Sequence, residues 1–214
     1  STLAAGILLY MLVADGEPGA HVCSAATTGK QAREVFDVAR AMALKARGFA
    51  ARFGVTIQTH SLVVAENFSN AEPLNAESST QDGLNIHCAV VDELHAHKTR
   101  GLYDVLDTAT GARSQPLILM ITTAGTDKAG ICYEQREYTV NALQHTLPVD
   151  GGGDETWLGL IFALDPEDDW RDPKVWRKAN PNLGVSVKLD DLMSGCVKAQ
   201  GSPAARNNFK TKRL

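Results

Sequence analysis

The sequence predicts an α/β protein with a mostly parallel central sheet. Segments with strand character alternate along the chain with segments of helical periodicity. Two of the strand segments, NIHCAVV (85–91) and PLILMITTAG (116–125), contain nearly continuous apolar runs, which are typical of strands buried on both faces of a sheet. Such strands and the helices between them indicate a parallel sheet covered by helices.

The first part of the chain predicts the order helix, strand, helix. Residues 2–14 contain good helix formers and end at the turn cluster DGEPG (15–19). A short strand is expected at HVCSA (21–25). The following segment, 27–46, places apolar side chains on one helical face and opens with a threonine and a glutamine in capping-box spacing.

Further elements follow in the same alternating manner. Residues 54–65 are rich in β-branched side chains and predict one strand or a hairpin, whereas 67–83 predict a polar loop. Helices are expected at 101–110 and 133–146. The segment TWLGLIFAL (156–164) predicts another strand of the sheet.

A change of composition after Leu164 divides the chain. With 214 residues, of which 44% are hydrophobic, the chain is long enough to bury a substantial core. We expect residues 1–164 to form this core. Residues 165–214 are polar and rich in proline and tryptophan, and we expect them to form a small lid or linker subdomain held down by Trp170 and Trp176.

The composition narrows the classes of partner. Acidic residues outnumber basic ones, 25 to 21, and the formal net charge is −4, so no overall basic field favours nucleic acid or an anionic membrane. Any contact with DNA would therefore be local. The four cysteines are scattered without a Cys-x-x-Cys pair, which favours reduced thiols in a cytoplasmic compartment. The apolar stretch 3–14 is too short to cross a bilayer easily and predicts a buried helix.

Two adjacent carboxylates, Asp92 and Glu93, directly follow the buried strand 85–91. In open α/β sheets ligands bind beyond the carboxyl ends of the strands, so this pair lies where a site is expected. Nucleotide hydrolysis needs such a pair: Asp92 would hold a magnesium ion that bridges the phosphates, and Glu93 would position or deprotonate the attacking water. This is the arrangement of a Walker B motif with its catalytic glutamate. Acidic residues at strand ends also serve as helix caps or turns, which is the alternative interpretation.

A second strand end carries small and hydroxylated residues. The segment ITTAG (121–125) places Thr122, Thr123, Ala124 and Gly125 at the end of what is expected to be a neighbouring strand. There they would sense a γ-phosphate and relay its loss. An ordinary strand-to-loop turn has the same composition, but the nearby pair of carboxylates favours the functional interpretation.

The phosphate-binding loop G-x-x-x-x-G-K-[ST] has no intact copy in the sequence. SAATTGKQ (24–31) imitates it but has serine for the first glycine and glutamine for the metal-binding hydroxyl, so we interpret it as a coincidental match. The start of the chain, STLAAG (1–6), has the residues that follow Gly-Lys in many such loops. On this interpretation Ser1 and Thr2 contact the nucleotide, Ser1 also binds magnesium, and the missing glycine and lysine are expected upstream.

Several other polar residues are weaker candidates for metal binding, catalysis in trans or contact with DNA. His95 and His97 could join the carboxylates in a metal cluster, but no nearby cysteine or histidine pair completes it. Arg100 and Arg113 flank the helix at 101–110 and could act in trans as arginine fingers, although solvated surface arginines are far commoner. The basic segment 205–214 could contact DNA phosphates, with a solvated helix as the alternative.

The chain also resembles a known family over essentially its whole length. The stretches that carry the resemblance are, in order, STLAAGILLYMLVADGEPGAHVCSAATT, DGLNIHCAVVDELHAH, GARSQPLILMITTAG, CYEQREYTVNAL, DDWRDPKVWRKANPNLGVSV and NNFKTKRL. Together they resemble the large terminase subunit of tailed double-stranded DNA phages and prophages. The resemblance is specific because it joins a Walker B strand, a coupling motif and the segment W-x-K-A-N-P-N-L-G in the family's order.

The resemblance implies an ATPase motor with a P-loop NTPase-like three-layer fold of the additional-strand, catalytic-glutamate class, without its first strand and P-loop. It implies Ser1 as the P-loop hydroxyl, Asp92 as the Walker B aspartate, Glu93 as the catalytic glutamate and 122–125 as the coupling motif. Magnesium and ATP are the implied cofactor and substrate. Without the P-loop lysine, we expect the 214-residue chain alone to bind ATP weakly and hydrolyse it negligibly.

The resemblance also implies partners and a setting. The partners are double-stranded DNA, the portal protein, the small terminase subunit and further copies of the chain in a ring. The setting is the cytoplasm of the bacterial host, with no membrane involved. The family's nuclease domain, which cuts DNA, is expected beyond the end of the chain.

Two alternative functions stay open. Residues 92–95 spell the motif of a DExH-type helicase, but no second motor domain and no Q-x-x-G-R-x-x-R element follows. A decayed prophage gene could also yield an inactive remnant or a domain that only binds.

Overall fold

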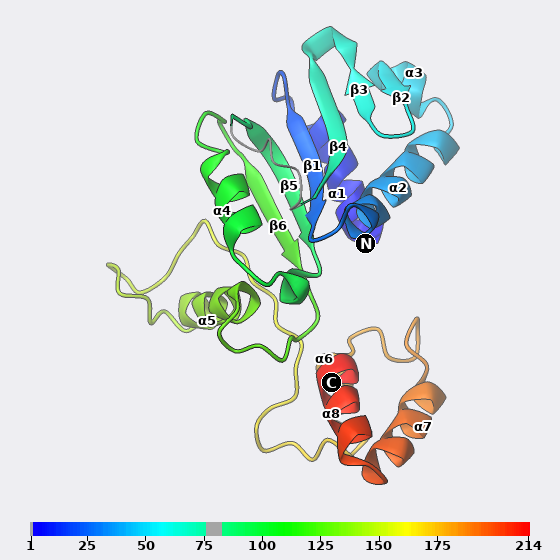
Figure 1. Cartoon of the computed structure of the whole chain (residues 1–214), viewed down its shortest axis with the longest axis vertical. Coiled ribbons are helices and arrows are strands. Elements are labelled where there is room, and N and C mark those ends of the chain that lie inside the picture. The colour runs from blue at the N-terminus through cyan, green and yellow to red at the C-terminus, as the bar shows by residue number, and fades with distance from the viewer. Residues whose placement is uncertain (1, 76–82) are drawn as a thin grey trace. The chain divides into compact units, whose positions relative to one another are not determined.

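The computed structural model describes residues 2–75 and 83–214 of the chain (Figure 1). These residues belong to two compact units, one that ends at Thr122 and one that runs from Thr123 to Leu214. The first unit contains the sheet, and the helices of the second unit form a small core of their own.

The first unit alternates strands and helices, as the sequence predicts. Residues 54–65 form a hairpin, whereas the polar loop predicted for 67–83 is wrong over 69–75, which form a strand; residues 76–82 lie outside the described part of the chain. In chain order the elements are α1 (Thr2–Val13), β1 (His21–Ala26), α2 (Gly29–Lys45), α3 (Phe49–Phe53), β2 (Val55–Ile57), β3 (Leu62–Val64), the 3-10 turn η1 (Ala65–Asn67), β4 (Ser69–Asn75), β5 (Ile86–Asp92), the 3-10 turn η2 (Leu94–Ala96), α4 (Gly101–Thr108) and β6 (Leu117–Ile121).

Six strands form one sheet in the order β2-β3-β4-β1-β5-β6. The pairs β4–β1, β1–β5 and β5–β6 are parallel, and the pairs at the β2–β3 end are antiparallel. The mostly parallel sheet predicted from the sequence is therefore confirmed. All seven residues of β5 are buried, which explains why residues 88–91 of that strand are all apolar.

Helices cover both faces of this sheet. On one face Leu8 of α1 and Phe36 of α2 are fully buried in a core with Val22, Cys88 and Val90 of the central strands. Helix α4 lies on the other side of the sheet, near β5 and β6 (Figure 1). The predicted arrangement of a parallel sheet between helices is confirmed, and the apolar helix at the start of the chain is buried against the sheet.

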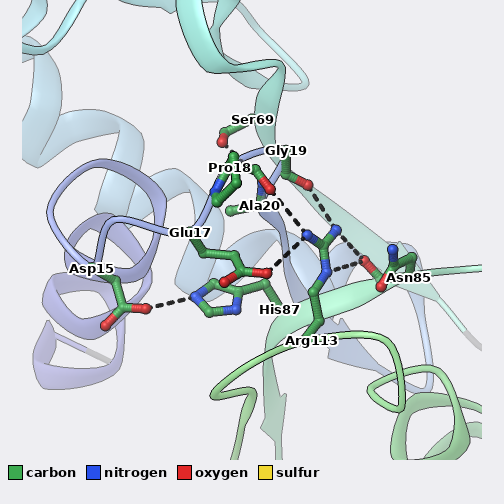
Figure 2. A network of polar contacts seen from close by, with 9 residues as sticks. All are labelled: Asp15, Glu17, Pro18, Gly19, Ala20, Ser69, Asn85, His87 and Arg113. Carbon is green, nitrogen blue, oxygen red and sulfur yellow. Dashed lines mark hydrogen bonds and ion pairs between the residues drawn. The ribbon is translucent and has the colours of Figure 1, made fainter.

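The side chain of Arg113 ties together the chain segments at the beginning of the central strands (Figure 2). Its guanidinium donates to the main-chain oxygens of Gly19 and Asn85, each at 2.7 Å. It also donates to the main-chain oxygen of Pro18 at 3.2 Å and pairs with the Glu17 carboxylate at 3.4 Å. Both charged side chains of this pair are largely buried, so the three carbonyls and the carboxylate depend on one cation.

A second polar contact at the same end of the sheet orients helix α1. The carboxylate of Asp15, just after α1, pairs with Nε2 of the buried His87 in β5 at 2.8 Å (Figure 2). His87 lies near the start of β5, so α1 ends where the parallel strands begin. Since α1 packs along the sheet, Thr2 at its other end lies toward the end where β5 and β6 finish.

The second unit is helical. It contains α5 (Ile131–Leu143), α6 (Trp176–Ala179), α7 (Leu189–Gln200) and α8 (Pro203–Arg213), and α5 matches the helix predicted at 133–146.

The strand predicted at 156–164 is wrong, because these residues form no strand. Leu158 is 88% exposed and Leu160 75%, while Trp157 packs edge-on against Tyr138 of α5 at a centroid distance of 4.9 Å. A strand requires a neighbour that pairs its main-chain groups, and none of the described strands pairs with this segment.

A small core built on tryptophan holds the last three helices. Trp176 is fully buried, and its ring lies edge-on to Phe209 of α8 with centroids 5.9 Å apart. Its indole N–H donates to the main-chain oxygen of Trp170 at 2.8 Å, and Asn180 donates to the main-chain oxygen of Arg213 at 2.7 Å. The tryptophan- and asparagine-containing segment therefore anchors α8, which agrees with the anchoring role predicted for the two tryptophans.

Replacing Trp176 with alanine should destabilise the second unit by about 3–5 kcal/mol, because the change removes a large buried ring and leaves a cavity. Urea unfolding followed by circular dichroism would measure the loss. The exposed Val185→Ala change is the control and should alter the free energy of unfolding by less than about 0.5 kcal/mol. Equal effects of the two changes would contradict the assignment of Trp176 to a core.

Replacing Arg113 with methionine should lower the free energy of unfolding of the first unit by about 3 kcal/mol, because it leaves a largely buried carboxylate and three carbonyls unpaired. Chemical denaturation is the measurement. Arg100→Met is a matched control, since Arg100 pairs with Asp104 at 2.9 Å on the surface of one helix, where such pairs contribute about 0.3–0.5 kcal/mol. If the Arg113 variant loses no more unfolding free energy than the control, the contacts of Arg113 do not stabilise the first unit.

Candidate functional site

The candidate site lies at the carboxyl ends of β5 and β6. These two strands pair in parallel with Asp92 opposite Ile121. Glu93 and Thr122 are therefore the next residues beyond the paired ends of two adjacent strands. The prediction that the ITTAG segment follows a strand neighbouring the one with the carboxylates is confirmed.

Asp92 is held in place by the main chain and keeps one oxygen available. The residue is 7% exposed, and its Oδ1 accepts the N–H of Glu93 at 3.0 Å. Its Oδ2 has no hydrogen-bond partner among residues 2–75 and 83–214. An oriented carboxylate oxygen at a strand end suits a magnesium ion, which prefers oxygen ligands and retains several waters.

Glu93 has an unusual backbone conformation. Its φ of 52° and ψ of 49° lie in the left-handed region, which costs a residue with a side chain roughly 1–2 kcal/mol. Although Glu93 precedes the turn η2, its side chain makes no capping hydrogen bond to that turn. The alternative interpretation of this carboxylate as a helix cap is therefore not supported. Strained residues of this kind concentrate at functional sites.

His95 connects the two strand ends. Its main-chain N–H donates to Oγ1 of Thr122 at 3.0 Å, and its ring Nδ1 lies 3.2 Å from the same oxygen. Nδ1 also lies 3.1 Å from Oε2 of Glu93. The sequence suggests His95 only as a possible metal ligand. No spacing in the sequence could have revealed this contact, because it depends on the left-handed turn at Glu93.

The sequence argues against a metal cluster of His95 and His97 with the carboxylates, and the structure gives such a cluster no support. Within the described parts of the chain, no three histidine, cysteine, aspartate or glutamate side chains converge as metal ligands. His97 is instead 6% exposed, and its Nε2 has no hydrogen-bond partner among the described residues. Burial lowers the pKa of His97, and a hydrogen bond with the main chain of Asp92 partly opposes that shift. The ring is therefore a neutral part of the packing around Asp92.

The proposed nucleotide contacts of Ser1 and Thr2 are only partly visible. Ser1 lies outside the described residues, whereas Thr2 is the first residue of α1. As the position of Asp15 shows, this end of α1 lies toward the end of the sheet that carries Asp92 (Figure 1). The free N–H groups and the positive dipole end of a helix favour phosphate at such a place.

The loop at 24–31 has a structural role. Oγ1 of Thr28 accepts the N–H of Gln31 at 3.3 Å and so caps α2, while Oγ of Ser24 donates to the main-chain oxygen of Ala32 at 2.7 Å. The predicted cap by Thr28 is confirmed, but the Gln31 side chain accepts from the hydroxyls of Thr27 and Thr28, at 2.8 and 3.0 Å, in place of the main-chain N–H of Thr28 that a capping box uses. The interpretation of residues 24–31 as only a coincidental match to a phosphate-binding loop agrees with these contacts.

The structure gives no support to Arg100 or Arg113 as a trans-acting arginine finger. Arg113 is bound within its own chain at the start of the strands, which is the end of the sheet opposite to Asp92. Arg100 pairs with Asp104 on the surface of α4. Thr123, Ala124 and Gly125 are exposed and begin the second unit, so their predicted coupling role stays a prediction.

A mostly parallel sheet covered by helices, with an acidic pair and a threonine at the carboxyl ends of adjacent strands, belongs to the open α/β folds that bind their ligands at this edge of the sheet. The comparison with families of known proteins narrows this class. The model described as "Terminase large subunit, ATPase domain" matches residues 1–141, and that described as "Terminase large subunit, endonuclease domain" matches residues 153–214. The chain therefore belongs to the family of large terminase subunits.

Individual relatives agree with the family. The chain is 46% identical to Protein YmfN of Escherichia coli K12 over 133 residues, which make up 62% of this chain and 28% of that protein. It is 25% identical to the large terminase subunit of Enterobacteria phage HK97 over 217 aligned positions, covering 99% of this chain and 41% of that protein. The crystal structure of the HK97 large terminase superposes with a TM-score of 0.82 over 99% of this chain and 43% of that one.

These matches cover less than half of either relative's length. The endonuclease match coincides largely with the predicted lid or linker subdomain, and the boundary between residues 164 and 165 stays a prediction. None of the helices in residues 2–75 and 83–214 is long and apolar enough to span a membrane.

Replacing Glu93 with glycine should give a protein about 1 kcal/mol more stable than replacing it with alanine. Both changes remove the carboxylate, but only glycine adopts a φ of 52° without a steric penalty. Urea unfolding of the two variants measures the difference. An alanine variant as stable as the glycine variant would show that the left-handed backbone at this position carries no strain.

Proposed function

We propose that this chain forms the hydrolytic part of an ATPase motor that moves double-stranded DNA into a phage procapsid. The observation that carries the proposal is the pairing of β5 with β6, which brings the acidic pair Asp92 and Glu93 beside Thr122. Membership of the large terminase subunit family, with a match to its ATPase domain, supports ATP as the substrate.

The two carboxylates have separate roles in this proposal. Asp92, fixed through Oδ1 and with Oδ2 available, holds magnesium either directly or through a bound water. The metal, when bound, supplies charge that neutralises the phosphate oxygens. Glu93 is more exposed than Asp92, with 42% of its side chain accessible, so its carboxylate can reach a water and orient it or accept its proton.

The nucleotide phosphates are proposed to lie at the start of helix α1. Ser1 and Thr2 would contact them there, and the Ser1 hydroxyl would be a further magnesium ligand. The helix dipole and the free N–H groups at this end of α1 favour the negative charge. The sequence contains no intact phosphate-binding loop, so we propose that the 214 residues alone bind ATP weakly and turn it over negligibly.

Residues 122–125 are proposed to couple hydrolysis to movement. They continue directly from β6, so loss of the γ-phosphate near Glu93 would displace the segment that leads into the second unit. Double-stranded DNA is the proposed load. The portal protein, the small terminase subunit and further copies of the chain in a ring are the proposed partners, in the cytoplasm of a bacterial host.

The first test is Glu93→Gln in a terminase that carries these residues together with a phosphate-binding loop. We expect the rate of ATP hydrolysis to fall about 10²–10⁴-fold, because glutamine cannot accept a proton, while binding of a fluorescent ATP analogue is retained. Glu66→Gln, on the exposed turn η1, is the control and should leave hydrolysis unchanged. Hydrolysis at the wild-type rate in the Glu93→Gln protein would reject the proposal.

The isolated chain gives a complementary test. Its ATPase activity should not exceed the background of the Glu93→Gln variant of the same chain. Robust turnover by the isolated chain that the substitution abolishes would show that the phosphate-binding loop is dispensable, and would reject the proposed weak binding.

A further inference from the structure

We propose that His95 is a positioning residue that links the hydrolytic carboxylate of Glu93 to Thr122 at the end of β6. This inference rests on the proposed ATPase function and adds to it a device by which the state of the coupling segment sets the orientation of the glutamate. His95 itself contacts neither the nucleotide nor the metal in this proposal.

The geometry places His95 between the two strand ends. The residue belongs to the turn η2, and 17% of its side chain is exposed. Oγ1 of Thr122 has two contacts with His95. It accepts the main-chain N–H of His95 at 3.0 Å, and it lies 3.2 Å from the ring Nδ1. The same Nδ1 lies 3.1 Å from Oε2 of Glu93. One ring nitrogen therefore lies within hydrogen-bond distance of a residue from each strand end.

The chemistry of these groups makes the two ring contacts compete. An ionised carboxylate only accepts hydrogen bonds, so the contact with Glu93 requires the proton on Nδ1 of His95. The Thr122 hydroxyl can donate to Nδ1 only when that nitrogen carries no proton, and otherwise it can only share the N–H directed at the carboxylate. The hydrogen bond from Nδ1–H of His95 to the Glu93 carboxylate is therefore strongest when the Thr122 hydroxyl does not also contact Nδ1.

This competition turns a displacement of Thr122 into a change at Glu93. The main-chain hydrogen bond from His95 to Thr122 makes the turn η2 follow the end of β6. Glu93 and His95 are only two residues apart in the sequence. The left-handed backbone at Glu93 turns the chain so that the Glu93 carboxylate lies beside the His95 ring. Glu93 is thus oriented for hydrolysis only in one arrangement of Thr122 and His95.

Three substitutions of His95 separate this role from packing. The amide nitrogen of asparagine lies about where Nδ1 lies in histidine, and the amide nitrogen of glutamine lies about where Nε2 lies. In a terminase that carries this chain with a phosphate-binding loop, we expect His95→Ala and His95→Gln to lower kcat for ATP about 10-fold, which corresponds to the loss of one positioning hydrogen bond. His95→Asn should stay within about threefold of wild type, and KM should change less than about twofold in all three variants.

The coupling itself gives a second readout. In a DNA packaging assay the ATP consumed per base pair moved should rise for His95→Ala and His95→Gln but not for His95→Asn. His60→Ala is the matched control, because His60 lies exposed between β2 and β3 and should leave both quantities unchanged. Melting temperatures within a few degrees of wild type would show that the variants are folded.

A measurement on the isolated chain does not depend on activity. Nitrogen-15 spectra of the imidazole rings should show the proton of His95 on Nδ1, and Glu93→Ala should move that proton toward Nε2 because the side-chain acceptor is lost. A bare Nδ1 in the wild-type chain would overturn the inference even if the His95 variants failed to fold.

The outcomes distinguish the inference from the proposed function. If Glu93→Gln abolishes hydrolysis but His95→Ala has the wild-type kcat, or His95→Gln performs as well as His95→Asn, the linking role of His95 is rejected and the ATPase proposal stands. If Glu93→Gln leaves hydrolysis unchanged, the proposed function itself fails.

Discussion

The parallel pairing of β5 between β1 and β6 determines where the candidate site residues lie. Every residue of β5 is buried, and the strand pairs with β1 on one side and β6 on the other, so a shift of register would break both sets of hydrogen bonds and disturb a fully packed core strand. The register that results places Asp92 opposite Ile121. The acidic pair and the threonine that follow these residues are neighbours because their strands are fixed, and not because they attract one another.

The end of β5 combines a rigid residue with a strained one. Asp92 is nearly buried and is fixed by the N–H of the next residue, so its position follows from the sheet. Glu93 adopts a left-handed backbone that a glycine would adopt at no cost. A magnesium ligand benefits from a fixed position, whereas a residue that activates water benefits from a carboxylate whose orientation can change. The turn at the end of β5 thus leaves Asp92 with a fixed carboxylate and Glu93 with a more exposed one.

Much of the fold was predictable from the sequence because its signals are local. The apolar runs of β5 and β6 and the capping threonine of α2 each report on a few adjacent residues, and the two strands and the cap are confirmed. The burial on both faces predicted for the run of β6 is wrong, because β6 is an edge strand of the described sheet and its five residues are only partly buried. Strand β4 was missed because its sequence, SNAEPLN, contains a proline and little alternation. The sheet tolerates Pro73 there because β3 pairs with β4 only as far as Ala71, so Pro73 has a neighbouring strand on one side alone. The segment 156–164 has the composition of a strand, but none of the described strands pairs with it, which no local pattern could reveal.

The positions of the acidic pair and of Thr122 at the ends of neighbouring strands were predictable from the sequence, but the contacts between these residues were not. The histidine that joins Glu93 to Thr122 was visible in the sequence only as a neighbour of two carboxylates. Its contact requires a backbone reversal at a glutamate, and left-handed residues other than glycine, asparagine and aspartate carry almost no sequence signal.

The guanidinium of Arg113 has a mechanical consequence for the whole sheet. It fastens the loop before β1, the residue before β5 and the segment before β6 to one another, and so removes relative sliding at the beginning of these strands. A change of register between β1 and β5 would therefore have to break these hydrogen bonds as well as those of the sheet. From the beginning of the strands, the guanidinium thus resists a shift that would displace the acidic pair at their other end.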